Sequence, residues 1–453
     1  MAKDLHTFLD DLRRNHPDDL LVIQQPVSKD YQVTALAMYL EQFSEKPSIL
    51  FTNVENSKFP VIANIFASYK RIAWILGLSS EAELVEAWPR IASQRVLPRV
   101  VENAPVKRIV LNGSNMDFSA FPILKHFDSD IAPYITAGVT IAKDPDSGIG
   151  NLSYARLQLK GKDKFGISLH SRGNLWDIQR RCEERNLPLE VAVVIGMHPA
   201  FNIAAATRLP LGEDEMELAG ALLGEPVEVI KAETVGLYFP AYADLVIEGI
   251  VLPKVREDEG PFGEYTGYST SRSTRHVMQV TAISYREDMI YHDIVPGAAS
   301  EHLNLSKTSR IPQFFASLKK VLPNVVAMNY PSSGTHFHCY LSLKKSMEGQ
   351  ARQAMSILFG LDIYLKLIVV VDEDIDVFNE QQVLWAIATR FQADRDIYMQ
   401  PGLPCNLLDP SSENGISAKL GLDATKKFGQ EVVTLNFSSE ILDQIKRLIG
   451  SHL

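Results

Sequence analysis

The chain has 453 residues and a formal net charge of -10, and 46% of its residues are hydrophobic against 22% charged. This length suggests two or three domains, and this balance is typical of soluble globular proteins and excludes a disordered or collagen-like chain. No block of Lys and Arg offsets the acidic charge, so we set nucleic-acid binding aside, and no apolar run approaches the roughly 18 residues of a membrane helix.

The N-terminus shows no signal-peptide pattern. Apolar residues from Leu5 to Leu12 recur at helical spacing among charged residues, which predicts an amphipathic surface helix. The three cysteines are few, odd in number and far apart, and they form no CxxC motif. These features favour a protein of the reducing cytoplasm without a structural metal or redox centre built on cysteine.

Short apolar runs predict strands at Ser48–Phe51 and Val61–Ala63 in the first hundred residues. A helix is predicted over Glu81–Trp88, with a preceding serine as its cap and Pro89 as its stop. Pro98 and Pro105 bracket a predicted linker, so we place the first domain boundary near residue 105.

From about residue 107 to residue 300 the pattern becomes rich in strands. The predicted strands are Gly138–Ala142, Leu152–Leu159, Leu189–Ile195, Val227–Ile230 and Val277–Tyr285. Two helices interrupt them, at Leu175–Glu184 and Asp214–Leu223. The sequence therefore predicts a β-rich middle region.

Beyond about residue 305 helices and strands alternate again. Leu367–Val371 reads as a buried strand, and Gln381–Phe391 and Ile441–Ile449 read as helices. We therefore expect an α/β (α+β) protein with an N-terminal α/β domain over 1–105, a middle domain over 106–310 and a C-terminal α/β domain over 311–453.

The common nucleotide, protease and hydrolase motifs are absent, but Asn151-Leu-Ser-Tyr-Ala-Arg156 follows a glycine-rich turn. An Asn carbonyl is a hard ligand for Mn²⁺ or Mg²⁺, and Arg is a planar clamp for anions. On a regular strand these two residues point to opposite faces, so they share a site only if the strand bends. An edge strand with a solvated Arg is the competing interpretation.

The segment Glu259-Gly-Pro-Phe-Gly-Glu264 places two carboxylates on either side of a turn. Two acids aimed into one cleft shift each other's pKa, which makes one of them available as a proton donor. A solvated surface turn is the alternative, and the neighbouring Glu257 and Asp258 favour it.

Three further groups are weaker. Acids around Glu215 open a predicted helix, where they complement the helix dipole, although one turned inward would bind a metal. His302 and Arg310 together would hold a carboxylate. His336 and His338 have no further ligand at metal spacing and read as strand surface or an interface.

Two more segments follow further along the chain, Val370-Val-Asp-Glu-Asp-Ile-Asp-Val-Phe378 and Trp385-Ala-Ile-Ala-Thr-Arg-Phe-Gln-Ala-Asp-Arg395. Together and in this order, all these segments resemble the UbiD-like decarboxylases. The resemblance covers about residues 136–410. It implies a central split-barrel domain that binds prenylated FMN, made by a flavin prenyltransferase, between two mixed α/β domains. It also implies reversible decarboxylation of aromatic, heteroaromatic or α,β-unsaturated acids, and a homo-oligomer (dimer or hexamer).

The resemblance also assigns residues. Asn151, Glu215 and His170 match the ligands of a divalent metal, usually Mn²⁺ and often with K⁺ nearby, that holds the cofactor phosphate. Arg156, Glu259 and Glu264 match the catalytic set, with Arg156 on the substrate carboxylate and Glu264 as proton donor. The remaining residues expected along the cofactor are Ser153, Tyr154, Ala155, Ser168, Leu169, Arg172 and Gly173.

The substrate is a further expectation. The spacing of His302 and Arg310 resembles that of furan-2,5-dicarboxylate decarboxylases, in which a second cation binds the second carboxylate. Hydroxybenzoate-type members share much of this pattern. We therefore expect conversion of the furan diacid to 2-furoate and CO₂, with a phenolic acid, or a flavin-binding subunit without turnover, as alternatives.

Overall fold

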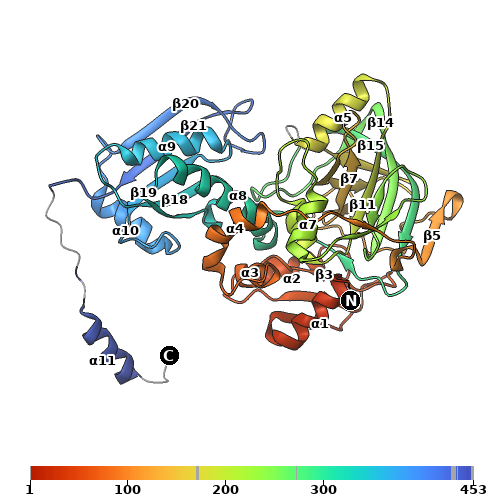
Figure 1. Cartoon of the computed structure of the whole chain (residues 1–453), viewed down its shortest axis with the longest axis horizontal. Helices are drawn as coiled ribbons and strands as arrows, with labels where there is room; N and C mark the ends of the chain where they lie inside the picture. The colour runs from red at the N-terminus through yellow and green to blue at the C-terminus, as the bar shows by residue number, and fades with distance from the viewer. Residues whose placement is uncertain (1, 170–172, 272, 430–434, 436, 450–453) are drawn as a thin grey trace.

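The structure is a computed structural model and describes residues 2–169, 173–271, 273–429, 435 and 437–449. Its helices and strands form three consecutive regions along the chain (Figure 1). The mixed α/β organisation expected from the sequence is confirmed.

The N-terminal region builds a four-stranded sheet. Its order is β1 (Leu20–Ile23), β2 (Ser48–Phe51), β3 (Val61–Ala63) and β16 (Tyr291–His292). β16 comes from far along the chain and pairs in parallel with β3. The helices of this region are α1 (Leu5–Asn15), α2 (Gln32–Leu40), α3 (Tyr69–Ile75) and α4 (Leu84–Ala92).

Helix α4 corrects the prediction for Pro89. A 3₁₀ turn covers Glu81–Glu83, and the α-helix continues through Pro89 to Ala92. Proline removes one intrahelical hydrogen bond. Trp88 and Ile91 lie buried on either side of it, and their packing keeps this part of the chain helical.

The middle region is a nine-stranded sheet. Its order along the main path is β6 (Tyr134–Ile135), β9 (Arg156–Leu159), β10 (Lys164–Ser168), β15 (Ser273–Tyr285), β14 (Leu245–Glu259), β11 (Leu189–Ile195), β7 (Val139–Lys143) and β8 (Gly150–Tyr154), with β5 (Ile109–Asn112) on β15. β8 and β9 are consecutive in the chain yet stand near opposite ends of this order. The sheet therefore curls until its two ends meet at Ala155.

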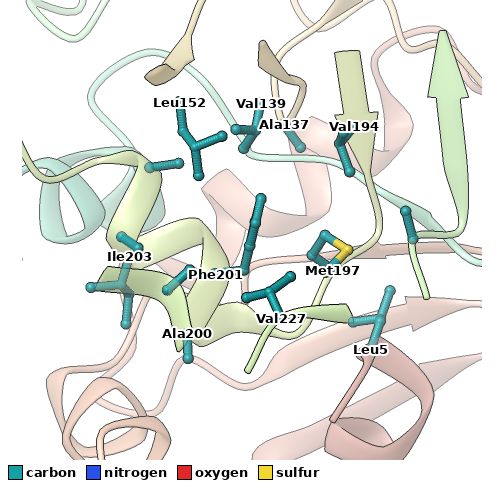
Figure 2. Close-up of a cluster of buried hydrophobic side chains, with 14 of the residues drawn as sticks. Leu5, Ala137, Val139, Leu152, Val194, Met197, Ala200, Phe201, Ile203 and Val227 are labelled. Carbon is teal, nitrogen blue, oxygen red and sulfur yellow. The ribbon is translucent and has the colours of Figure 1, made fainter. Parts of the chain in front are cut away.

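Three helices accompany this sheet: α5 (Asn174–Glu184), α6 (Pro199–Ala205) and α7 (Glu215–Leu223). Leu152, Val139 and Val194 from β8, β7 and β11 pack with Phe201 of α6 and Leu5 of α1 in one buried cluster (Figure 2). A small three-stranded sheet of β13 (Tyr238–Pro240), β12 (Glu228–Lys231) and β4 (Arg99–Val100) lies alongside. The cluster joins the N-terminal helix to the curled sheet.

The C-terminal region is a five-stranded sheet with helices. Its order is β17 (Val325–Asn329), β18 (His338–Leu343), β19 (Leu367–Asp372), β21 (Ile416–Ala424) and β20 (Ile397–Pro404). Its helices are α9 (Gln350–Leu361) and α10 (Glu380–Arg390), and the terminal helix α11 (Ser439–Ile449) extends away from the body (Figure 1).

Helix α8 (Ser300–Val321) leads from the middle region into the C-terminal one. The carboxylate of Glu301, which is fully buried, accepts hydrogen bonds from the backbone of Asn64 and Val295, each at 2.9 Å. The first turn of α8 is thus fixed to the N-terminal sheet. None of the helices that the structure describes is long and apolar enough to cross a membrane.

Candidate active site

The strand that carries Asn151 and Arg156 breaks where the sheet closes. β8 pairs with β7, whereas β9 pairs with β10 and β6, and only Ala155 separates the two strands. The single continuous strand predicted over Leu152–Leu159 is therefore wrong. The break supplies the bend that Asn151 and Arg156 need in order to serve one site.

Arg156 contacts both carboxylates of the Glu259–Glu264 segment. Its Nε and Nη2 donate to the two oxygens of Glu259 at 2.8 and 2.9 Å, and its Nη1 donates to Glu264. The guanidinium carbon lies 4.8 Å from the ring centroid of Phe262. Glu259 is 1% exposed and Glu264 8%, so this is a buried cluster and not a solvated turn.

Burial sets the protonation of this cluster. It raises the pKa of Glu264, and the charge of Arg156 opposes this rise only in part. Burial also disfavours a charged Arg156, but its hydrogen bonds to Glu259 and the charge of Glu264 outweigh that effect, so the pKa of Arg156 is raised. Glu264 is therefore an acid that retains its proton more readily than a solvated Glu.

Asn151 and Glu215 meet at the other end of the six-residue stretch. The Asn151 Nδ2 lies 3.0 Å from Glu215 Oε2, which also accepts from the backbone of Leu152 at 2.9 Å. Both side chains are buried, and burial raises the pKa of Glu215 to about 7. A buried carboxylate beside an amide is a donor set that suits a hard divalent cation.

The part of the chain that the structure describes offers no third metal ligand beside this pair. Among the described residues no cluster of three His, Cys, Asp or Glu side chains has the geometry of a metal site. The predicted ligand His170, like the predicted cofactor contact Arg172, lies outside the described residues. A small hollow next to the pair is lined by Gly150, Asn151, Asn174 and Glu213, among others.

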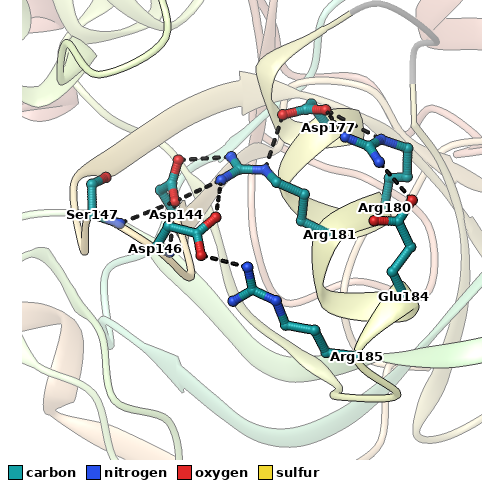
Figure 3. Close-up of polar contacts among 8 residues, drawn as sticks. All are labelled: Asp144, Asp146, Ser147, Asp177, Arg180, Arg181, Glu184 and Arg185. Carbon is teal, nitrogen blue, oxygen red and sulfur yellow. Dashed lines mark hydrogen bonds and ion pairs between the residues drawn. The ribbon is translucent and has the colours of Figure 1, made fainter.

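The hairpin before Asn151 is held by an arginine of α5. Arg181 donates to both carboxylate oxygens of Asp144, at 3.0 and 2.7 Å, and also to Asp146 and Asp177 (Figure 3). Hydrogen bonds from the Arg181 side chain, and then from the backbone of Asp146 and Ser147, lower the pKa of Asp144 to about 2. The network fixes the β7–β8 turn, and with it the start of the strand that carries Asn151.

The other predicted cofactor residues follow the chain around this site. Ser153 donates to Asn151 Oδ1 at 2.9 Å, and the Tyr154 hydroxyl accepts from Asn202 at 2.8 Å. Ser168 is the strand partner of Arg156. The remaining described members are Ala155, which is buried at the break, Leu169, buried after β10, and Gly173, the N-cap of α5.

His302 and Arg310 both lie on α8, on either side of a group of aromatic residues. The rings of Tyr265 and His302 are 6.4 Å apart, and those of Tyr265 and Tyr364 are 6.0 Å apart. Arg310 lies 4.0 Å over Tyr364 and forms an ion pair with the buried Asp362. Because Tyr265 follows Glu264 directly, these side chains form the next layer beyond Glu264.

His336 belongs to the same group, whereas the sequence predicted strand surface or an interface for it. It is 3% exposed, lies 4.8 Å from the ring of Tyr265 and contacts Ser306 Oγ at 3.0 Å. β18 begins only at His338, so the two histidines do not share a strand face. The sequence offered no signal for Asp362 or Tyr364 and did not place His336 here, because all three reach this group only through tertiary packing.

Family models match almost the whole chain. Residues 99–299 match the 3-octaprenyl-4-hydroxybenzoate carboxy-lyase Rift-related domain, and residues 10–88 and 305–424 match the N-terminal and C-terminal domains of the same family. The chain belongs to the UbiD family. The resemblance drawn from its motifs is confirmed.

Individual members of the UbiD family are also similar to this chain. The chain is 34% identical to the anhydromevalonate phosphate decarboxylase of Methanosarcina mazei, over 92% of this chain and 95% of that one. The UbiD-class enzyme HmfF from Pelotomaculum thermopropionicum, solved in complex with FMN, superposes with a TM-score of 0.92 at 36% identity, covering 98% of this chain and 99% of that one.

An evolved dimeric form of HmfF, solved with prenylated FMN, superposes with a TM-score of 0.87 at 33% identity over 97% of this chain and all of that one. The vanillic acid decarboxylase of Sedimentibacter hydroxybenzoicus in its open form superposes with a TM-score of 0.85 at 28% identity, over 99% and 100% of the two chains. The protein is a UbiD-family decarboxylase, a carboxy-lyase, as expected.

Proposed function

We propose that this UbiD-family protein is a prenylated-FMN-dependent, reversible decarboxylase of a heteroaromatic acid, with furan-2,5-dicarboxylate as substrate and 2-furoate and CO₂ as products. The observation that carries the chemistry is Arg156 bound between two buried carboxylates, Glu259 and Glu264. Such a set combines an anion clamp with a proton donor in a site that excludes water.

The cofactor phosphate would be held through a divalent cation, Mn²⁺, on Asn151 and Glu215, with His170 as the third protein ligand and K⁺ nearby. The burial of both described ligands and their contact with each other support this assignment. When bound, prenylated FMN supplies an electrophilic carbon that takes up the electron pair released as CO₂ leaves.

The side chains supply the remaining steps. Arg156 binds the substrate carboxylate, and Glu259 holds the guanidinium plane by its two parallel hydrogen bonds. After the C–C bond breaks, Glu264 gives its proton to the ring carbon that has lost CO₂, and the reverse transfer starts carboxylation. A proton donor with a raised pKa suits this role near neutral pH.

The second carboxylate of a diacid would lie beyond Glu264, at His302 and Arg310. His302 is near Tyr265, and Arg310 stacks on Tyr364, which itself packs against Tyr265. A buried anion requires such a partner, because an unpaired buried charge costs several kcal/mol. These tilted aromatic rings would flank a small flat substrate.

Two other acids remain as alternatives. The 34% identity to anhydromevalonate phosphate decarboxylases favours an acid with a phosphate in place of the second carboxylate. The likeness to vanillic acid decarboxylase favours a phenolic acid. A flavin-binding subunit without turnover is disfavoured, since the Arg156–Glu259–Glu264 contacts are all present.

The remaining expectations are also proposals. A flavin prenyltransferase would supply the cofactor, the enzyme would act in the cytoplasm, and it would assemble as a homo-oligomer, a dimer or a hexamer. The evolved dimeric form of HmfF is compatible with oligomers in this family.

The test is a panel of acids given to protein produced together with a flavin prenyltransferase and supplied with Mn²⁺. The panel contains furan-2,5-dicarboxylate, 2-furoate, a phosphorylated α,β-unsaturated acid and 4-hydroxybenzoate, and the measurement is CO₂ release. The furan diacid should give the highest kcat/KM. A higher value for any other acid rejects the furan diacid as the substrate, and no release from any of them rejects the proposed function.

A further inference from the structure

The backbone between Pro261 and Glu264 is fastened from two sides. On one side the chain folds back on itself, and Thr270 N donates to Phe262 O at 2.8 Å while Glu264 N donates to Tyr268 O at 3.0 Å. On the other side lies a separate segment of the curled-sheet region, residues 126–134. Ile131 N of that segment donates to Pro261 O at 3.2 Å. The loop thus has an internal support and an external one.

Asp130 is the centre of the external support. Its side chain is 2% exposed, and its Oδ1 accepts from the backbone N–H of Gly263 at 2.9 Å. Its Oδ2 accepts from the backbone of Phe127 at 3.0 Å and from that of His126 at 3.3 Å. One carboxylate therefore joins its own segment to the residue that directly precedes Glu264. Hydrogen bonds to an ionised acceptor are stronger than neutral ones.

Phe127 packs the same two segments together. A Cβ placed on Gly263 would lie 2.3 Å from a ring carbon of Phe127, and one on Gly297 would lie 2.9 Å from another. The carbonyl of Gly297 lies 3.2 Å from His302 Nδ1. The ring of Phe127 thus fills the space between the loop of Glu264 and the turn beside His302. It lies so close to Gly263 and Gly297 that no larger residue fits at either position.

We propose that Asp130 is a positioning residue for the reaction, which fixes the carboxyl of Glu264 relative to Arg156 through the Gly263 amide. This inference rests on the proposed function of Glu264 as proton donor. Arg156 belongs to β9 and Glu259 ends β14, so both have the sheet as their support. Loss of Asp130 therefore loosens the external support of the loop that carries Glu264 and leaves the contact between Arg156 and Glu259 in place. A displacement of about 1 Å is enough to cost on the order of 10²-fold in rate.

The experiment compares Asp130→Ala and Asp130→Asn with Asp128→Asn in the flavin-loaded enzyme. Asp128 is exposed in the same turn, so its variant controls for the loss of a nearby charge. Three quantities are measured: kcat per flavin-loaded site, KM for furan-2,5-dicarboxylate, and hydrogen–deuterium exchange of the peptide that contains Gly263. Melting temperature and flavin content identify any variant that is misfolded.

Asp130→Ala should lower kcat per loaded site by about 10- to 100-fold, with KM within threefold of the wild type, and should raise exchange at the loop at least tenfold. Asp130→Asn keeps the shape and one acceptor oxygen, although its NH₂ group faces backbone N–H donors. Because one acceptor remains, kcat should fall less in this variant than in Asp130→Ala. Asp128→Asn should match the wild type.

Unchanged kcat in a folded, loaded Asp130→Ala enzyme overturns the proposal, whether or not the loop exchanges faster. If Asp130→Ala does not fold, the same criterion applies to Asp130→Asn. A wild-type enzyme that decarboxylates no acid refutes the proposed function instead, and the exchange measurement then still decides whether Asp130 holds the loop.

Discussion

Arg156 binds Glu259 as a planar fork, with two parallel hydrogen bonds of 2.8 and 2.9 Å, and presents its third nitrogen to Glu264. The two glutamates are thus unequal partners of one guanidinium. Glu259 accepts from Nε and Nη2 and so orients the guanidinium, whereas Glu264 meets a single nitrogen of it. This asymmetry agrees with a structural role for Glu259 and a proton-transfer role for Glu264.

Glu264→Gln should lower kcat by at least about 10²-fold, because the amide keeps the shape of the side chain but has no proton to transfer at the required pKa. Flavin content should stay at the wild-type level. The measurement is single-turnover decarboxylation of the loaded enzyme. Glu257→Gln is the matched control, since Glu257 lies on β14 and contacts Lys160 and Lys164 instead of Arg156.

The same residue predicts the pH dependence. Burial raises the pKa of Glu264, so the proton-donating form persists above the range of an ordinary Glu and is lost as the pH rises through the raised value. Wild-type kcat for decarboxylation should therefore fall on the alkaline side with a one-proton dependence. Glu264→Gln should lack this limb, and an unchanged profile in the variant would assign the limb to another group.

Glu215→Ala should empty the metal site and weaken flavin retention, because it removes a buried oxygen ligand next to Asn151. Metal analysis and the flavin absorbance of the purified protein check this. Glu217→Ala, in the same first turn of α7, should retain both. Normal Mn and flavin content in the Glu215 variant would refute the assigned metal site.

Arg310→Leu should lower kcat/KM for furan-2,5-dicarboxylate far more than for 2-furoate, because only the diacid loses a partner. The expected change in the ratio is about 10-fold or more, as for other charge-assisted hydrogen bonds of about 1.5–3 kcal/mol. Kinetics with both acids measure it. An unchanged ratio would remove Arg310 from the substrate site.

Arg310→Leu also removes the positive charge that pairs with the buried Asp362. An uncompensated buried charge destabilises the fold. The double variant Arg310→Leu/Asp362→Asn removes that charge. It should melt at a higher temperature than Arg310→Leu and should show the same altered ratio of the two acids. Tyr330 still contacts position 362 through its hydroxyl.

Arg181→Met should lower the melting temperature by about 2–4 °C at neutral pH, because it removes the two hydrogen bonds that lower the pKa of Asp144. A carboxyl group whose pKa is lowered in the folded protein stabilises the fold at pH values above the ordinary pKa of Asp. This stabilisation is lost as the pH falls towards 2. The difference from wild type should therefore shrink below about pH 4. Arg180→Met, whose partners Asp177 and Glu184 lie on its own helix, should change little.

Local patterns predicted much of the fold. The strands at Ser48–Phe51 and Val61–Ala63 have the predicted bounds, since continuous apolar runs between polar turns leave little choice of boundary. The break at Ala155 was not predictable as a position, because it follows from the closure of the sheet and not from the residues on either side. Pro89 shows the same limit, since burial of Trp88 overrides a local stop signal.

The candidate site divides in the same way. Arg156, Glu259 and Glu264 were visible as two motifs about a hundred residues apart, and their contacts join these motifs. Asp130 and Asp362 were not visible, because each is an ordinary polar residue until a distant element packs against it. His336 was noticed, but its place in the aromatic group was not predictable. Residues that carry chemistry within a motif can be found in a sequence, whereas the residues that hold them in place emerge only with the tertiary structure.

The six residues from Asn151 to Arg156 set the distance between two parts of the candidate site. One end belongs to the proposed anchor of the cofactor phosphate and the other to the clamp for the substrate carboxylate, and five residue steps of extended chain span at most about 17 Å. Strand pairing fixes both ends of this stretch, because β8 pairs with β7 and β9 pairs with β10. An insertion or deletion here would change the distance between the two anchors and would separate the cofactor phosphate site from the carboxylate site.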